Sequence, residues 1–189
     1  MVPQIFSRKI FVFAAVIFTL MFSNCLAASQ VNITDINAED FFNGVREVMA
    51  SGKVTKDKSF ELYDLRRTEE KIPKFDNLTV WKASYGDKNS SAPDGEITFL
   101  VDEKDRVFSV GLATDLNVEN CADKASILIV SICSALSLTE EEIAQLVSSG
   151  HKADGMLTAT VKCSATNRNI SWVVYSKDGK GCVDFFSLG

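Results

Sequence analysis

The sequence has few of the residues and motifs that common catalytic and metal sites need. It contains one histidine, His151, so a Ser-His-Asp or Cys-His mechanism would have to use that residue. No serine occupies a G-x-S-x-G turn, and neither an EF-hand loop nor a phosphate-binding glycine loop is present. His151 directly follows a glycine that ends a predicted helix, so we expect it beside the terminal carbonyls of that helix. These absences favour a non-enzymatic protein without a cofactor or metal.

Only one long apolar run occurs, and it lies near the N-terminus. Arg8 and Lys9 precede the apolar run Ile10–Phe22, and the small residues Ala27 and Ala28 follow it. This order is typical of a secretory signal peptide. The run has 13 residues, whereas a membrane-spanning helix needs about 20. We therefore predict a signal peptide over residues 1–28, and a secreted or periplasmic mature protein with no membrane span.

The mature chain is acidic. Residues 1–28 hold two of the 20 basic residues and none of the 25 acidic ones, which leaves 18 against 25 and a net charge of −7. An acidic surface argues against nucleic acid and anionic membranes as partners. It favours a basic or neutral protein partner.

The mature cysteines all lie in the second half of the chain. Cys25 belongs to the predicted signal peptide, and Phe22 and Asn24 do not fit the small residues that precede a lipidated cysteine. The other four are spaced by 12, 30 and 19 residues, which excludes the close pairs of a zinc site. An even number in an exported chain predicts two disulfides. The cysteines concerned are Cys121, Cys133, Cys163 and Cys182.

One disulfide pairing can be excluded from helix geometry. If a single helix carries Cys121 and Cys133, a rise of 1.5 Å per residue separates their backbones by about 18 Å. A disulfide needs Cα atoms within about 7 Å. We therefore expect helix-to-strand bridges that join these two residues to Cys163 and Cys182, in either of the two possible ways.

Capping patterns predict two helices. Thr139 and Glu142 form a capping box at the start of a helix over residues 140–149. Asn37 caps an earlier helix that ends at Gly52. Both helices should therefore begin at fixed positions in the fold.

Most of the remaining chain is predicted to form strands. The apolar run within residues 122–136 is an exception, since its length and an acidic residue near its start favour a buried helix. Alternating patterns separated by turn signals predict strands at 78–84, 96–101, 107–113, 156–163, 170–175 and 182–187, with a further strand at 60–65.

The two halves of the mature chain share an order of elements, in which a capped helix precedes antiparallel strands. Residues 78–83 and 97–105 align with residues 157–163 and 170–178. We therefore predict an α+β fold of two related helix-plus-antiparallel-sheet units. Their helices should pack on one sheet face and leave the other face open.

The predicted units comprise residues 29–115 and residues 116–189. This arrangement is similar to that of secreted beta-lactamase-inhibitor proteins, which pair two helix-plus-sheet repeats and bind an enzyme with a concave sheet. The similarity concerns size, export, cysteine number and repeat order. It implies no particular binding residue.

Four aromatic residues are the candidate binding residues. Trp81 and Trp172 fall in corresponding strands of the two units, and Tyr85 and Tyr175 lie near strand ends in matching positions. Together they could form a platform on the open sheet face. Burial in the core is the stronger interpretation for Trp172, because large aromatic side chains are usually buried. We expect the two tyrosines to stay partly exposed.

These observations favour an exported, non-enzymatic binding module that acts on a protein, as a binder or an inhibitor, through an open sheet face. One alternative is a small extracytoplasmic hydrolase that uses carboxylates, for which three acidic groups are candidates. Another is a structural component of the cell envelope. The candidate carboxylates are Asp94 with Glu96, Asp102 with Asp105, and the run Glu140 to Glu142.

Overall fold

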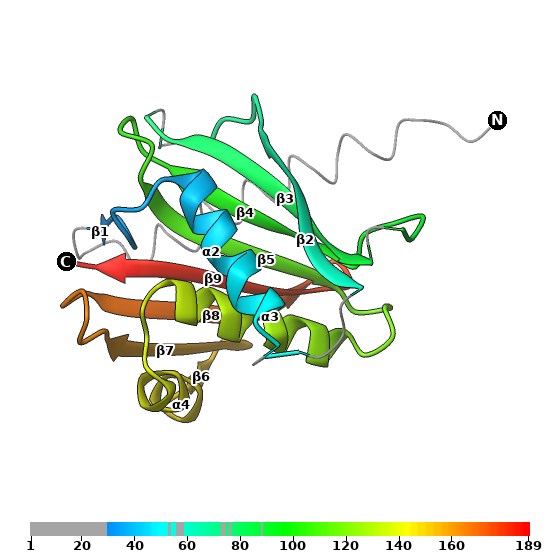
Figure 1. Ribbon diagram of the computed structural model, residues 1–189. Helices are drawn as coiled ribbons and strands as arrows, with labels where there is room; N and C mark the ends of the chain where they lie inside the picture. Colours follow the sequence, from blue (N-terminus) through cyan, green and yellow to red (C-terminus); the bar gives the residue numbers. More distant parts are fainter. Residues whose placement is uncertain (1–29, 53, 56–58, 73–74, 76, 88) are drawn as a thin grey trace.

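A computed structural model describes residues 30–189, except for 53, 56–58, 73–74, 76 and 88. The predicted signal peptide and Cys25 lie outside the described residues. The described chain builds one large antiparallel sheet and a layer of helices (Figure 1).

The sheet of the described chain has nine strands: eight follow the order β2-β3-β4-β5-β9-β8-β7-β6, and the short strand β1 pairs with the end of β9. Strands β5 and β9 are neighbours at its centre, so the last strands of the two halves of the chain pair with each other. All six segments predicted to be strands are strands, and so is the segment at 60–65. The strands are β1 (Gln30–Val31), β2 (Phe60–Arg67), β3 (Thr79–Asp87), β4 (Gly95–Val101), β5 (Val107–Asp115), β6 (His151–Ala153), β7 (Met156–Lys162), β8 (Asn169–Lys177) and β9 (Lys180–Leu188).

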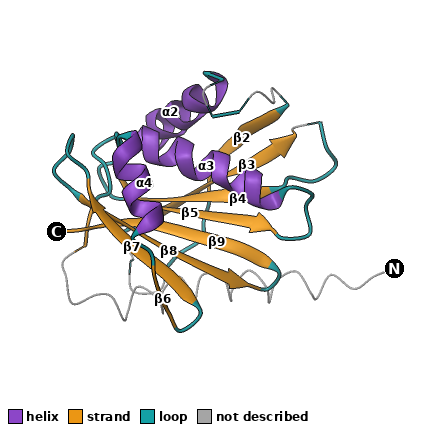
Figure 2. Cartoon of the chain, turned by 90° about the horizontal axis from the view of Figure 1, so that it is seen from below, coloured by secondary structure: helices purple, strands orange, loops and turns teal. Residues whose placement is uncertain are grey.

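In the described chain, three helices lie over one face of the sheet: α2 (Ala38–Ala50), α3 (Cys121–Ala135) and α4 (Glu140–Ser148). Figure 2 shows all three on the same side. The face turned away from them is called the open face below. The prediction that the helices pack on one sheet face is therefore correct.

Local sequence explains where two of the helices begin. The side chain of Asn37 accepts a hydrogen bond of 2.9 Å from the amide of Asp40 at the start of α2. At the start of α4, the hydroxyl of Thr139 accepts from the amide of Glu142, whose carboxylate accepts from the amide of Thr139. Both predicted caps are confirmed, and the capping box satisfies two amide groups that a helix end leaves without partners.

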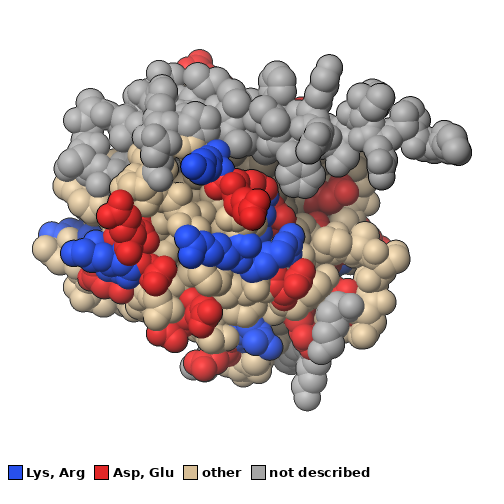
Figure 3. Space-filling model, turned by 90° about the horizontal axis from the view of Figure 1, so that it is seen from above, with Lys and Arg blue, Asp and Glu red and all other residues tan. Residues whose placement is uncertain are grey.

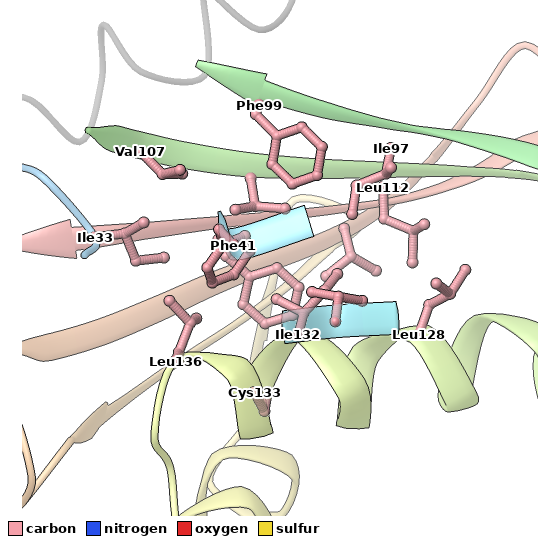
Figure 4. Close-up of a cluster of buried hydrophobic side chains, with 14 of the residues drawn as sticks. Ile33, Phe41, Ile97, Phe99, Val107, Leu112, Leu128, Ile132, Cys133 and Leu136 are labelled. Atoms are coloured by element: carbon pink, nitrogen blue, oxygen red, sulfur yellow. The ribbon is translucent and has the colours of Figure 1, made fainter. Parts of the chain in front are cut away.

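One hydrophobic core fills the space between the helices and the sheet. Phe41 of α2 meets Phe99 of β4 edge to face, with ring centroids 6.0 Å apart. Leu128 and Ile132 of α3 are fully buried in the same cluster, which Figure 4 shows in close-up. Burying such a side chain contributes about 1.5–3 kcal/mol relative to leaving it exposed. Because residues from both halves of the chain join this core, the helix layer and the sheet form one packed body.

The fold is therefore α+β, as predicted, with a single continuous sheet. Two repeated units are not confirmed by it. Among the described residues, the first half contributes one helix, α2, and the second half contributes α3 and α4, so the layers of the two halves differ. The two halves also share their core and do not each enclose one.

Candidate functional site

A cleft of about 220 Å³ lies on the open face. It crosses the centre of the sheet, where β5 pairs with β9. Gly111 and Ala113 of β5 contribute no side chain larger than a methyl group there, which leaves room between bulkier neighbours. We call this hollow the open-face cleft. It is lined by Glu70, Ile72, Val80, Lys82, Glu96, Thr98, Leu100, Gly111, Leu112, Ala113, Tyr175, Lys177, Asp178, Lys180, Cys182 and Asp184.

A row of paired residues runs across the cleft. Lys82, Thr98, Gly111 and Asp184 are successive register partners on β3, β4, β5 and β9. Neighbouring strands lie about 4.8 Å apart, so the backbones of Lys82 and Asp184 are separated by about 14 Å. A cationic and an acidic side chain thus occupy opposite ends of one row, with small residues between them.

The cationic end of the row is neutralised within the chain. The Lys82 Nζ lies 2.8 Å from Glu70 Oε1 and 3.3 Å from Glu96 Oε1. Arg66 adds a longer contact of 3.7 Å to the other oxygen of Glu96. The Lys82 side chain is only 10% exposed, and a cation with so little water around it needs carboxylate partners.

The acidic end of the row is more isolated from charge. Asp184 is 6% exposed, and its Oδ2 accepts a hydrogen bond of 3.0 Å from the hydroxyl of Tyr175 on β8. Burial raises the pKa of Asp184 to about 7, and the hydrogen bond from Tyr175 opposes this only in part. Asp184 is therefore a carboxyl group that changes its charge near neutral pH.

Two neighbours of Asp184 stay uncharged near neutral pH. Burial, followed by the charge of Asp184, raises the pKa of Tyr175 above its ordinary value. Burial and the same charge raise the pKa of the Cys182 thiol to about 11. Cys182 and Tyr175 are register partners on β9 and β8, so a phenol and a thiol, both neutral, lie next to the carboxyl group.

The four predicted binding residues do not gather on the open face. Trp81, Tyr85 and Trp172 all belong to the core beneath the helices, and only Tyr175 lies on the open face. Tyr85 is fully buried, so the expectation that it stays partly exposed is wrong; its hydroxyl donates to Thr114 Oγ1. Alternation along β3 turns residues 81, 83 and 85 toward the helices. Burial in the core, the stronger interpretation for Trp172, is confirmed.

The prediction of two disulfides requires correction, since the four cysteines of the described chain are free. Cys133 and Cys163 lie in the core beneath the helices, whereas Cys182 lines the cleft on the other side of the sheet. The Cys163 thiol points to the carbonyl oxygens of Leu136 and Ser137, at 3.7 and 3.6 Å. The argument against a bridge between Cys121 and Cys133 holds, because α3 carries both.

The predicted carboxylate pairs have structural partners. Asp94 pairs with Lys124, and Glu142 caps α4. Partial burial favours the neutral form of Asp102, but hydrogen bonds from Asn32, Arg106 and the backbone lower its pKa to about 2. His151 is exposed at the start of β6. Of the acidic candidates from the sequence, only Glu96 lines the cleft.

Sequence reasoning missed the two ends of the row, although a signal was present. Asp184 stands between Val183 and Phe185, and Lys82 stands between Trp81 and Ala83. A charged residue inside an apolar strand is unusual, because burial of charge is costly without a partner. That pattern could have marked both residues as candidates.

Other properties of the described residues are compatible with many functions. On the face shown in Figure 3, Lys and Arg side chains interleave with Asp and Glu side chains.

Among the described residues, no helix has the length and hydropathy of a membrane span, and no three His, Cys, Asp or Glu side chains are grouped as metal ligands would be. No family model, curated protein or solved structure matches this chain.

Proposed function

We propose that this protein is an exported binding module that recognises a protein partner with its open face. The observation that carries the proposal is the open-face cleft, which combines apolar and charged lining residues at the centre of the sheet. Binding sites typically have this composition, with an apolar surface for affinity and a few polar groups for orientation. The acidic mature chain and the predicted signal peptide supply the expected context.

The surroundings of the cleft support a protein partner. Phe75 lies on the open face, where its ring packs at 6.0 Å from that of Phe108, and both side chains are only partly buried. Phe75 also contacts the cluster formed by Val173 and Phe186. Partly exposed apolar side chains beside a cleft are common in protein interfaces, where aromatic residues contribute much of the affinity.

We also propose that the two halves derive from one α+β unit. The strands β3, β4 and β5 on one side of the central junction correspond in order to β7, β8 and β9 on the other. The aligned segments 78–83 and 157–163 fall largely on β3 and β7, and the segments 97–105 and 170–178 begin on β4 and β8. On this proposal the cleft lies where the two units meet, and both supply contacts.

Matched arginine substitutions test the binding function. Thr98→Arg fills the floor of the open-face cleft, and Asn43→Arg adds the same charge to an exposed position of α2. The mature protein and both variants are immobilised and exposed to the native exported fraction. We expect the wild type and Asn43→Arg to retain the same partner and Thr98→Arg to lose it. A partner that Thr98→Arg retains and Asn43→Arg loses would reject the open face as the interface.

Hydrolysis by carboxylates is a second candidate, favoured by one observation. Asp184 is a buried carboxyl group with a pKa of about 7, which suits a general acid, and Glu70 and Glu96 line the same cleft. The test is turnover of fluorogenic glycoside and peptide panels by the mature protein. Activity that disappears in Asp184→Asn supports hydrolysis, whereas no turnover by the wild type rejects it. A structural role in the cell envelope stays a prediction from the sequence.

A further inference from the structure

We infer that the open-face cleft takes a basic side chain of the partner, a lysine or an arginine, with Asp184 as its counterion. The inference rests on the proposed binding function and names the chemistry that the cleft recognises. Three observations carry it: the charge partners within the cleft, the distances along the sheet, and the apolar lining.

The charge partners leave Asp184 as the acidic group that lacks a cation. Lys82 already contacts Glu70 and Glu96. Lys177 lies 3.9 Å from the carboxylate of Asp178. In the described part of the chain no ion pair reaches Asp184, whose carboxyl group accepts a hydrogen bond from the neutral phenol of Tyr175. Burying a carboxylate without a cation costs free energy. A cation that binds beside Asp184 removes this cost, so its binding is more favourable here than elsewhere in the cleft.

The other cations of the cleft are too distant to occupy this position. Lys177 and Lys180 are register partners at the end of the β8–β9 hairpin. Lys180 is four residues from Asp184 along β9, which corresponds to about 13 Å of strand. The backbone of Lys82 is about 14 Å away across three strand spacings. No ion pair among the described residues joins these lysines to Asp184.

The apolar lining suits the aliphatic part of a basic side chain. Ile72, Val80 and Leu100 form one buried cluster on the open face and line the cleft. Lysine and arginine bury their methylene groups along such surfaces and keep the charged end near polar partners. The negative mature chain favours a basic partner in addition.

The inference predicts a defined pH dependence. The ionised form of Asp184 binds a cation, and burial raises the pKa of this group to about 7. Raising the pH from 6 to 8 therefore increases the ionised fraction about tenfold. The titratable and charged groups that face the cleft from the surrounding elements are Glu70, Lys82, Glu96, Tyr175, Lys177, Asp178, Lys180 and Cys182.

The test uses a minimal probe and a neutral analogue. Nα-acetyl-lysine N-methylamide and the corresponding norleucine compound share an aliphatic stem but differ in charge. Binding to the full mature protein is followed by NMR titration at pH 6 and pH 8. We expect the lysine probe to bind about tenfold more tightly at pH 8 than at pH 6, and binding at pH 6 should release nearly one proton because Asp184 must ionise. The norleucine probe should bind at least tenfold more weakly at pH 8, without pH dependence.

Variants assign the effect to one carboxyl group. Asp184→Asn should reduce binding of the lysine probe to the level of norleucine. Asp178→Asn removes an exposed acid from the same lining and should change the affinity less than twofold. Tyr175→Phe keeps the carboxyl group but removes its hydrogen bond, so the pH of half-maximal affinity should rise. This last variant tests the inference even if Asp184→Asn does not fold.

The outcomes separate this inference from the proposed function. If Thr98→Arg abolishes partner capture while the lysine probe fails to bind, the binding function stands and the cation site is rejected. If the lysine probe binds with the expected pH dependence but Thr98→Arg leaves capture unchanged, the cation site stands and the open face is rejected as the interface. Equal binding of the lysine and norleucine probes, or equal binding by Asp184→Asn and wild type, overturns the inference.

Discussion

The two faces of the sheet differ although the same strands build both. Tyr85 and Tyr175 show the difference most directly. Tyr85 is buried beneath the helices and bonds to the neutral hydroxyl of Thr114, whereas Tyr175 lies on the open face and bonds to the carboxyl of Asp184. On the covered face, the Tyr85 hydroxyl has a neutral partner and the ring is part of the core. The open face keeps a titratable pair beside a cleft, which makes it the better candidate for binding.

The largest expected effect compares neighbours on β4. Phe99→Ala removes a fully buried ring from beneath the helices and should destabilise the protein by about 3–5 kcal/mol. Thr98→Ala, one residue earlier but on the open face, should cost less than about 0.5 kcal/mol. Urea unfolding measures both. Similar losses would mean that the open face is packed as tightly as the covered one.

The second prediction concerns pH and the open face. The folded-state pKa of Asp184, about 7, lies above the value near 3.9 expected when unfolded. Its contribution to stability is therefore present in full below about pH 4 and is lost as the pH rises to 7. The asparagine of Asp184→Asn does not ionise, so this variant does not lose stability in that pH range. At pH 8 its free energy of unfolding should be higher than that of the wild type by roughly 2–4 kcal/mol. Unfolding curves between pH 4 and pH 8 measure the difference.

Asp102 serves as the internal contrast for this measurement. Its pKa is lowered to about 2 by hydrogen bonds from Asn32, Arg106 and the backbone. Its contribution is present above about pH 4 and is lost as the pH falls toward 2, in both wild type and Asp184→Asn. A stability difference between these two proteins that develops only below pH 4 would contradict the assignment to Asp184.

The third prediction tests whether the helix layer can be weakened without changing the open face. Thr139→Ala should destabilise the protein by about 1 kcal/mol through the lost cap. Glu142→Ala should cost about as much, because this carboxylate accepts from the amides of both Thr139 and Ser164. Thermal unfolding measures both changes. Binding of the lysine probe at pH 8 should not change; a loss would show that the two faces are coupled.

The smallest effect is expected for an exposed ion pair beside the cleft. Arg66 lies 2.9 Å from Asp64, and both side chains are largely exposed. Asp64→Asn should change stability by less than about 0.5 kcal/mol, since water screens such pairs. Urea unfolding at 50 mM and 500 mM salt measures the change. A loss above 1 kcal/mol at low salt would show that the charges bordering the open face act as a network.

Much of the secondary structure could be predicted because its causes are local. The caps at Asn37 and Thr139 depend on residues within one turn, and the strands follow from alternation and turn residues. The candidate site was predicted only in part. Tyr175 lies in the cleft, but Tyr85 does not, because alternation shows which residues share a face and not which face the helices cover.

The sequence by itself determined the capped starts of α2 and α4, the strands β2 to β5 and β7 to β9, the acidic charge and the α+β class, since each depends on neighbouring residues or on composition. Only the tertiary structure decided that β5 pairs with β9 and that Lys82 and Asp184 occupy one row. It also decided that Cys133 and Cys163 lie in the core beneath the helices while Cys182 lines the cleft. These features depend on contacts between residues distant in sequence, because strand order and helix position are set when the whole apolar surface is buried together.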